Sequence, residues 1–181
     1  MGRSTQNASR TTDLTAQQLS DYFIDKVDVI RRGTGESAVI THLQPAIVTF
    51  SGFMESSSND IEKLILDSPS TSCSLDPVPT SILKEFLAVL LPFVTRMCNA
   101  SLREGFLPLS QRHAIVSPFL KKPTAPVDEA KNYRPISTLT FISKLIERIA
   151  CRQLTTYLET NNLLPRHQSG YRRAIQLRLR F

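Results

Sequence analysis

Basic side chains recur at every fourth position of a helical segment in the second half of the sequence, at Lys144, Arg148 and Arg152. Four-residue spacing places them along one side of a helix. Just before this helix, Pro135 disfavours helical backbone at Arg134, so we expect Arg134 on an extended segment. A row of cations beside an arginine on a strand suits a polyanion such as nucleic acid better than a small neutral ligand.

A second group of cations follows a predicted strand over residues 111–120. The strand delivers Lys121 and Lys122 to a loop with two prolines, and the chain returns at Asn132 to the extended segment that carries Arg134. We expect an antiparallel hairpin that places Lys121 or Lys122 near Arg134. A lysine point charge and an arginine fork together suit a triphosphate. The alternative is an ordinary hairpin with solvated cations, which these residues taken alone favour.

Helical periodicity predicts the elements that must position these cations. The predicted helices span about residues 16–32, 60–66, 79–91, 92–104 and 140–160. The last of them has one apolar face, which we expect to be buried. That face consists of Ile142, Leu145, Ile146, Ile149, Leu154, Tyr157 and Leu158.

Capping residues predict where these helices begin and end. Pro92 is expected to break the pair in the middle of the chain, and Gly105 to end the second helix of that pair. Asp76, ahead of two prolines, is expected to cap the first helix of the pair, which explains this acid without catalysis. The other predicted caps are Asp13 or Thr15, Asn59 or Asp60, Thr138 or Thr140, and the break at Asn161-Asn162.

The net charge of +6 is unevenly distributed along the 181 residues. Residues 111–181 contain 13 Lys and Arg against 4 Asp and Glu, whereas the first 110 contain 9 against 12. A solvated surface is the ordinary explanation for such a bias. The spacing within the basic half favours nucleic acid and nucleotide phosphate instead.

Several classes of protein are disfavoured by the composition. The longest apolar run, residues 86–94, is too short to span a bilayer, and no secretory signal is recognisable. Three scattered cysteines form neither a disulfide framework nor, with the three histidines, a zinc site. We therefore expect an intracellular protein, cytoplasmic or nuclear, with no membrane partner.

Several sequence blocks, in order, resemble the reverse transcriptases (RNA-directed DNA polymerases) of non-LTR, LINE-type retrotransposons. The first such block of that family is similar to Asn-Tyr-Arg-Pro-Ile-Ser at 132–137 followed by Ser-Lys-Leu-Ile-Glu-Arg at 143–148. Upstream, 75–79 and 116–122 are similar to the entry segment, and downstream Gln-Ser-Gly-Tyr-Arg at 168–172 is similar to the next block. The resemblance runs from about residue 61 to 173.

The resemblance implies an α+β, mostly helical chain: incomplete fingers with a small antiparallel hairpin and no palm. It implies that Lys122, less surely Lys121, and Arg134 bind the incoming nucleotide, and that Gly170, Tyr171 and Arg172 lie beside RNA or DNA template and primer. Tyr171 could equally pack in a core. The expected domains are a tail, helix and connector (1–58), a partial polymerase domain (59–173) and an off-pattern tail (174–181).

The family pattern stops after Arg173. Relatives continue with a segment of the type GHSTETAF, and removing one base from a coding strand for that peptide yields AIQLRLRF, the last eight residues here. We therefore expect a shifted reading frame or an equivalent gene-model error. The palm aspartates that hold Mg²⁺ in the intact enzyme would be missing, so we expect no cofactor and no polymerase activity from this chain alone. The alternatives are a co-opted nucleic-acid-binding or interaction module and a purely structural helical protein.

Overall fold

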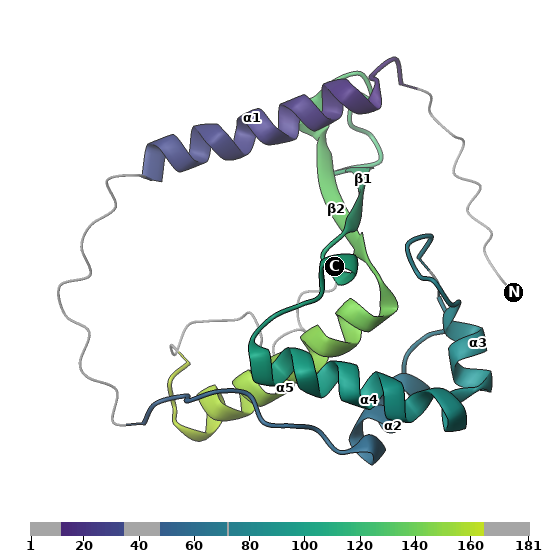
Figure 1. Ribbon diagram of the computed structural model, residues 1–181. Helices are drawn as coiled ribbons and strands as arrows, with labels where there is room; N and C mark the ends of the chain where they lie inside the picture. Colours follow the sequence, from purple (N-terminus) through teal and green to yellow (C-terminus); the bar gives the residue numbers. More distant parts are fainter. Residues whose placement is uncertain (1–11, 35–47, 72, 165–181) are drawn as a thin grey trace, which may run out of the picture. The chain divides into compact units, whose positions relative to one another are not determined.

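The computed structural model describes residues 12–34, 48–71 and 73–164 (Figure 1). The chain divides into two compact units, each described by itself below. Unit 1 consists of residues 1–43 and 115–138, and unit 2 consists of residues 44–114 and 139–181. The described part is mostly helical with one two-stranded hairpin, so the predicted α+β class is confirmed. The assignment to polymerase fingers without a palm, and the predicted domain boundaries, stay predictions.

The helices and strands follow the predicted order. Unit 1 contains α1 (Ala16–Thr34), the paired strands β1 (Ala114–Leu120) and β2 (Tyr133–Leu139), and the short 3-10 helix η2 (Ala130–Asn132). Unit 2 contains α2 (Ser58–Leu66), α3 (Thr80–Glu85), α4 (Leu87–Glu104), the 3-10 helix η1 (Leu109–Gln111) and α5 (Phe141–Thr160).

The start of α1 is fixed to the turn end of the hairpin, as Figure 1 shows. Thr15 and Gln18 form a reciprocal capping box, because each side chain accepts a hydrogen bond from the other residue's backbone N–H. This confirms Thr15 as a cap. The hydroxyls of Thr12 and Tyr133 both donate to the carbonyl of Val127, at 2.7 and 2.8 Å. Val127 and Tyr133 are both buried, and the two bonds tie the segment before α1 to the hairpin.

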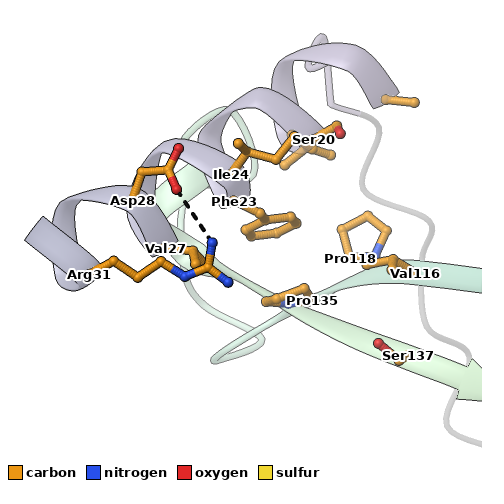
Figure 2. A pocket seen from close by; sticks show the side chains of 12 residues that line it. Ser20, Phe23, Ile24, Val27, Asp28, Arg31, Val116, Pro118, Pro135 and Ser137 are labelled. Carbon is orange, nitrogen blue, oxygen red and sulfur yellow. Dashed lines mark ion pairs between the residues drawn. The ribbon is translucent and has the colours of Figure 1, made fainter. Parts of the chain in front are cut away.

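An apolar groove of about 560 Å³ separates α1 from one face of the hairpin. Figure 2 shows the ring of Phe23 directed toward Pro118 and Pro135, and an ion pair between Arg31 and Asp28 near the end of the helix. Leu19 is the one buried apolar residue of α1. The other apolar side chains of this helix are therefore only partly covered within unit 1; Ile24, Val27 and Ile30 are exposed.

The core of unit 2 is built where α2, α4 and α5 meet. Ile61, Ile65 and Cys98 are fully buried, and Leu145 is nearly so. On α5 the predicted apolar face is buried over its first half, whereas Leu154 is exposed. Burial of a large aliphatic side chain contributes about 1.5–3 kcal/mol, so this three-helix contact is the main source of stability in the unit.

Two side-chain amides attach an irregular segment, residues 48–56, to the helices of unit 2. We call this segment the strap. Asn99 of α4 accepts from the N–H and donates to the carbonyl of Ser56, at 2.9 and 3.0 Å. Gln153 of α5 binds Met54 in the same way, with both bonds at 2.8 Å. Each amide thus replaces the partner that a neighbouring strand would supply.

The N-terminus of α5 lies in a buried polar network. Thr140 is the N-cap, as predicted, and its hydroxyl oxygen accepts from the N–H of Ser143 at 3.2 Å. The same hydroxyl contacts the side-chain oxygen of Gln111 at 2.6 Å, and the Ser143 hydroxyl donates to the Gln111 carbonyl at 2.5 Å. The predicted strand start was therefore wrong: Gln111 ends η1, and β1 begins three residues later.

Asp76 does not cap the helix that follows it, and that prediction was wrong. Pro79 is the N-cap of α3 and provides no side-chain bond. Instead, Asp76 accepts from the N–H of Cys73 and, across 65 positions of sequence, from the N–H of Phe141, both at 2.7 Å. The carboxylate therefore satisfies one of the free N–H groups in the first turn of α5, where the helix dipole also favours negative charge.

Two further predicted helix boundaries were wrong. The N-cap of α2 is Ser57, not Asn59 or Asp60, because the Ser57 oxygen accepts from the N–H of Asp60 at 3.1 Å. The break between α3 and α4 falls at Phe86, and Pro92 lies inside α4. Pro92 has no N–H, so the carbonyl of Ala88 lacks its usual helical donor. Both residues are exposed, so water can replace the missing bond. Gly105, with φ of 63°, ends α4 as predicted.

Replacing Asp76 by alanine should destabilise unit 2 by about 1–3 kcal/mol, because two N–H groups lose their acceptor. Urea denaturation followed by far-UV circular dichroism would measure the change. Asp67→Ala is the matched control, since Asp67 is exposed at the end of α2, and it should change stability by less than about 0.5 kcal/mol. Equal effects of the two substitutions would contradict the role given to Asp76.

The three thiols should differ in reactivity. Burial raises the pKa of Cys98 to about 12, so its thiol stays protonated at neutral pH. Cys73 is also buried, whereas Cys151 is exposed on α5. A thiol-specific reagent at pH 8 should therefore modify Cys151 first, and all three only in denaturant. Fast modification of Cys98 in the folded protein would show that the core is open.

Ionisation of the Cys98 thiol is easier in the unfolded chain than in the folded one, because burial raises its pKa from 9.0 to about 12. The free energy of unfolding should therefore fall as pH rises from about 9 to 12.

Candidate nucleic-acid interface

The hairpin of unit 1 carries the predicted phosphate-binding cations near its turn. Lys121 and Lys122 directly follow β1, and Arg134 is the second residue of β2. The N–H of Lys121 donates to the carbonyl of Asn132 at 2.8 Å, which fixes the register at this end of the hairpin. In that register Arg134 lies opposite Phe119 and diagonal to Lys121, at about 7–8 Å between Cα atoms.

Arg134 and Pro135 are adjacent, so their side chains point to opposite faces of the hairpin. Pro135 lines the groove beneath α1. Arg134 therefore projects from the face that α1 leaves open, and it is exposed. This placement agrees with the predicted hairpin, whereas the phosphate-binding role of its cations stays a prediction.

The positive charges of this hairpin are not equally available. The Lys121 amine donates to the carbonyl of Lys131, and the Lys131 amine pairs with Glu129 at 2.9 Å. The hydrogen bond from Lys131 lowers the pKa of Glu129, and the same contact raises the pKa of Lys131. Within the described residues, Lys122 and Arg134 have no side-chain hydrogen bond or ion pair. These two cations are therefore the ones free to bind an anion.

The basic row on α5 is only partly free. Lys144 is half-buried, and Arg148 donates from one guanidinium nitrogen to the hydroxyl of Ser68 at 2.6 Å. Arg152 is exposed and lines a groove beside the strap. A guanidinium has five N–H donors, so Arg148 keeps others for a second partner. The predicted row is present, but its members differ in their exposure and in their hydrogen bonds.

Two further cations were missed by the sequence interpretation. The Lys84 amine donates to the carbonyls of Leu66, at 2.9 Å, and Ser68, beside the C-terminus of α2 where the helix dipole favours a cation. The Arg112 guanidinium stacks over the ring of Phe106 at 4.0 Å. Lys84 and Leu66 belong to different helices, and Phe106 and Arg112 both lie outside helices and strands, so helical or strand periodicity indicates neither contact.

The predicted contacts of Gly170, Tyr171 and Arg172 lie outside the described residues. In the part that is described, no cluster of three His, Cys, Asp or Glu side chains is arranged to hold a metal ion. None of the described helices is long and apolar enough to cross a bilayer. The candidate residues that the structure describes as exposed are thus Lys121, Lys122 and Arg134 in unit 1 and Arg148 and Arg152 in unit 2.

Comparisons with known proteins find relatives of one kind, although no protein-family model matches the chain. It is 30% identical over 111 residues, 61% of its length, to the probable RNA-directed DNA polymerase from transposon X-element of Drosophila melanogaster. It is 33% identical over 101 residues (56%) to the probable RNA-directed DNA polymerase from transposon BS of the same species. It is 30% identical over 82 residues (45%) to the RNA-directed DNA polymerase from mobile element jockey of Drosophila funebris.

The matched segments span only 9–12% of the length of these relatives. They nevertheless agree with the resemblance predicted from the ordered sequence blocks. That resemblance is confirmed: over about half of its length, the chain is similar to the RNA-directed DNA polymerases of non-LTR retrotransposons.

Proposed function

We propose that this chain binds nucleotide phosphate and template–primer nucleic acid as part of an RNA-directed DNA polymerase. The observation that carries the proposal is its similarity to three such polymerases, at 30–33% identity. The exposed cations of the hairpin and of α5 support it, since phosphate contacts dominate nucleic-acid affinity. The sequence blocks that carry the resemblance include the hairpin cations and, on α5, Lys144 and Arg148.

In unit 1, Lys122 and Arg134 bind the phosphates of a nucleoside triphosphate. The lysine supplies a mobile point charge, and the arginine supplies a planar fork that bonds two phosphate oxygens at once. Lys121 contributes its backbone to the hairpin register and a weaker charge, because its amine already donates to Lys131. In unit 2, Arg152, with Lys144 and Arg148, contacts the sugar–phosphate backbone.

The chain by itself does not extend a primer. Nucleotide transfer by this chemistry requires two divalent metal ions, which activate the primer hydroxyl and stabilise the leaving pyrophosphate. The printed sequence contains no adjacent pair of aspartates, and the described residues do not fit a metal ion. No catalytic step is therefore assigned to this chain. Magnesium-dependent primer extension by the purified chain would contradict this part of the proposal.

Arg134→Ala should weaken binding of a fluorescent nucleoside triphosphate by about tenfold, which corresponds to the loss of about 1.4 kcal/mol. Arg134→Lys should recover part of the affinity, because the charge returns without the fork. Fluorescence anisotropy at low salt would measure both. The matched control is Lys26→Ala, an exposed cation of α1 in the same unit. A loss as large in that control would mean that the hairpin has no specific role.

Arg152→Ala should weaken binding of an RNA template–primer duplex and lower the slope of log affinity against log salt by about one. Arg96→Ala is the control, since Arg96 is an exposed arginine on α4 of the same unit. Filter binding over a series of salt concentrations would give both slopes. If the wild-type chain fails to bind the duplex even at low salt, the nucleic-acid part of the proposal is wrong.

A further inference from the structure

Residues 121–132 connect β1 to β2 in unit 1, and we call them the hairpin loop. Lys122 lies in this loop, and Arg134 lies just beyond its end on β2. A loop of this length has many conformations unless internal bonds restrict it. The position of the Lys122 amine relative to the Arg134 guanidinium therefore depends on the bonds that fix the loop.

Asn132, the last residue of the hairpin loop, bonds three other parts of it. Its side-chain amide donates to the carbonyl of Pro126 at 2.9 Å and to the carboxylate of Glu129 at 3.2 Å. Its N–H donates to the carbonyl of Glu129 at 3.0 Å, and its carbonyl accepts from the N–H of Lys121 at 2.8 Å. Asn132 is half-buried, and it holds the loop through both its backbone and its side chain.

These bonds enclose the turn that contains Lys122. The N–H of Ala125 donates to the carbonyl of Lys122 at 3.1 Å, so residues 122–125 form a β-turn. The residue just before this turn and the residue just after it both have a backbone group bonded to Asn132. Both ends of the turn are therefore attached to one residue, which lies two positions before Arg134 in the sequence.

The side chain at position 132 must donate twice, because both of its partners are acceptors. The amide group of an asparagine supplies two N–H donors from one nitrogen atom, which matches a carbonyl and a carboxylate. A leucine has nearly the same shape but no donor. Glu129 also pairs with the Lys131 amine at 2.9 Å, so its charge is balanced within the loop. The bonds at this position thus depend on the amide and not on the size of the side chain.

We propose that Asn132 is a positioning residue, which holds Lys122 at a fixed distance from Arg134 so that both cations contact one triphosphate. This role rests on the proposed function, from which the phosphate-binding role of the two cations is taken. A preorganised pair of cations binds more tightly than a mobile pair, since less conformational freedom is lost on binding. Asn132 acts through the loop and needs no contact with the phosphates.

The ratio of triphosphate affinity to monophosphate affinity tests this role. A triphosphate can reach both cations, whereas a monophosphate needs only one, so loss of positioning lowers the ratio. Partial unfolding instead lowers both affinities by the same factor. Asn132→Ala and the isosteric Asn132→Leu should each weaken triphosphate binding about fivefold and leave monophosphate binding nearly unchanged. Fluorescence anisotropy of the full chain with ATP and AMP that carry the same fluorophore would measure both affinities.

Tyr133→Phe is the matched control. The Tyr133 hydroxyl donates to the carbonyl of Val127 in the same loop at 2.8 Å, and Thr12 donates to that carbonyl as well. The substitution leaves the bonds of Asn132 in place, so the affinity ratio should stay at its wild-type value. An unchanged ratio in both Asn132 variants, or an equal fall in Tyr133→Phe, would overturn the positioning role. A wild-type chain that binds neither nucleotide would instead contradict the proposed function itself.

Hydrogen exchange tests the loop without any nucleotide. The Ala125 N–H is protected by its bond to Lys122, so its exchange rate reports whether the turn is held. Measured by NMR, this rate should rise about fivefold or more in Asn132→Leu and stay near the wild-type rate in Tyr133→Phe. An unchanged rate in Asn132→Leu would show that Asn132 does not hold the turn, and it would overturn the positioning role even if the chain binds triphosphate.

Discussion

The fold depends most on how the first turn of α5 is bonded. A helix begins with four N–H groups that lack helical partners, and here this end is buried. The Thr140 hydroxyl and the Asp76 carboxylate accept from two of these groups, while Gln111 bonds the hydroxyls of Thr140 and Ser143. An unsatisfied polar group at such a site costs about 1–3 kcal/mol. The network therefore permits one position of the helix start and joins three segments distant in sequence.

The position of α5 in turn determines what its side chains do. Its buried face packs on α2 and α4 in the core, and Gln153 binds the strap through backbone groups alone. The basic residues of α5 then differ in their contacts: Arg148 bonds Ser68, and Arg152 remains exposed. A similar difference holds in the hairpin, where Lys121 and Lys131 form local contacts, whereas Lys122 and Arg134 have no side-chain partner among the described residues. A cation is available to phosphate only when the fold has not already used it.

Local patterns predicted much of this arrangement. The period of apolar residues located α5 and α1, the glycine at 105 ended α4, and Pro135 identified the strand that holds Arg134. The errors at Asp76 and Gln111 arose where the partner lies far away in sequence, whereas those at Ser57 and Phe86 are shifts of local helix boundaries. Asp76 stands before two prolines, which is a strong local signal for a cap, yet its carboxylate bonds Phe141. Likewise, nothing near Arg148 indicates Ser68, and nothing near Asn99 indicates the strap. Local sequence shows which groups need a partner but not which distant residue supplies it.

The discontinuity of unit 2 has a consequence for its synthesis. Residues 115–138 form part of the other unit, so α5 is made only after this insertion. Until then the nascent chain presents the faces of α2 and α4 that carry Ile61, Ile65 and Cys98 without the helix that covers them. Contacts of such large sequence separation form slowly, since a long loop must close first. Newly made chains therefore expose this apolar surface until α5 has been synthesised, and transiently exposed surface of this kind is prone to aggregation.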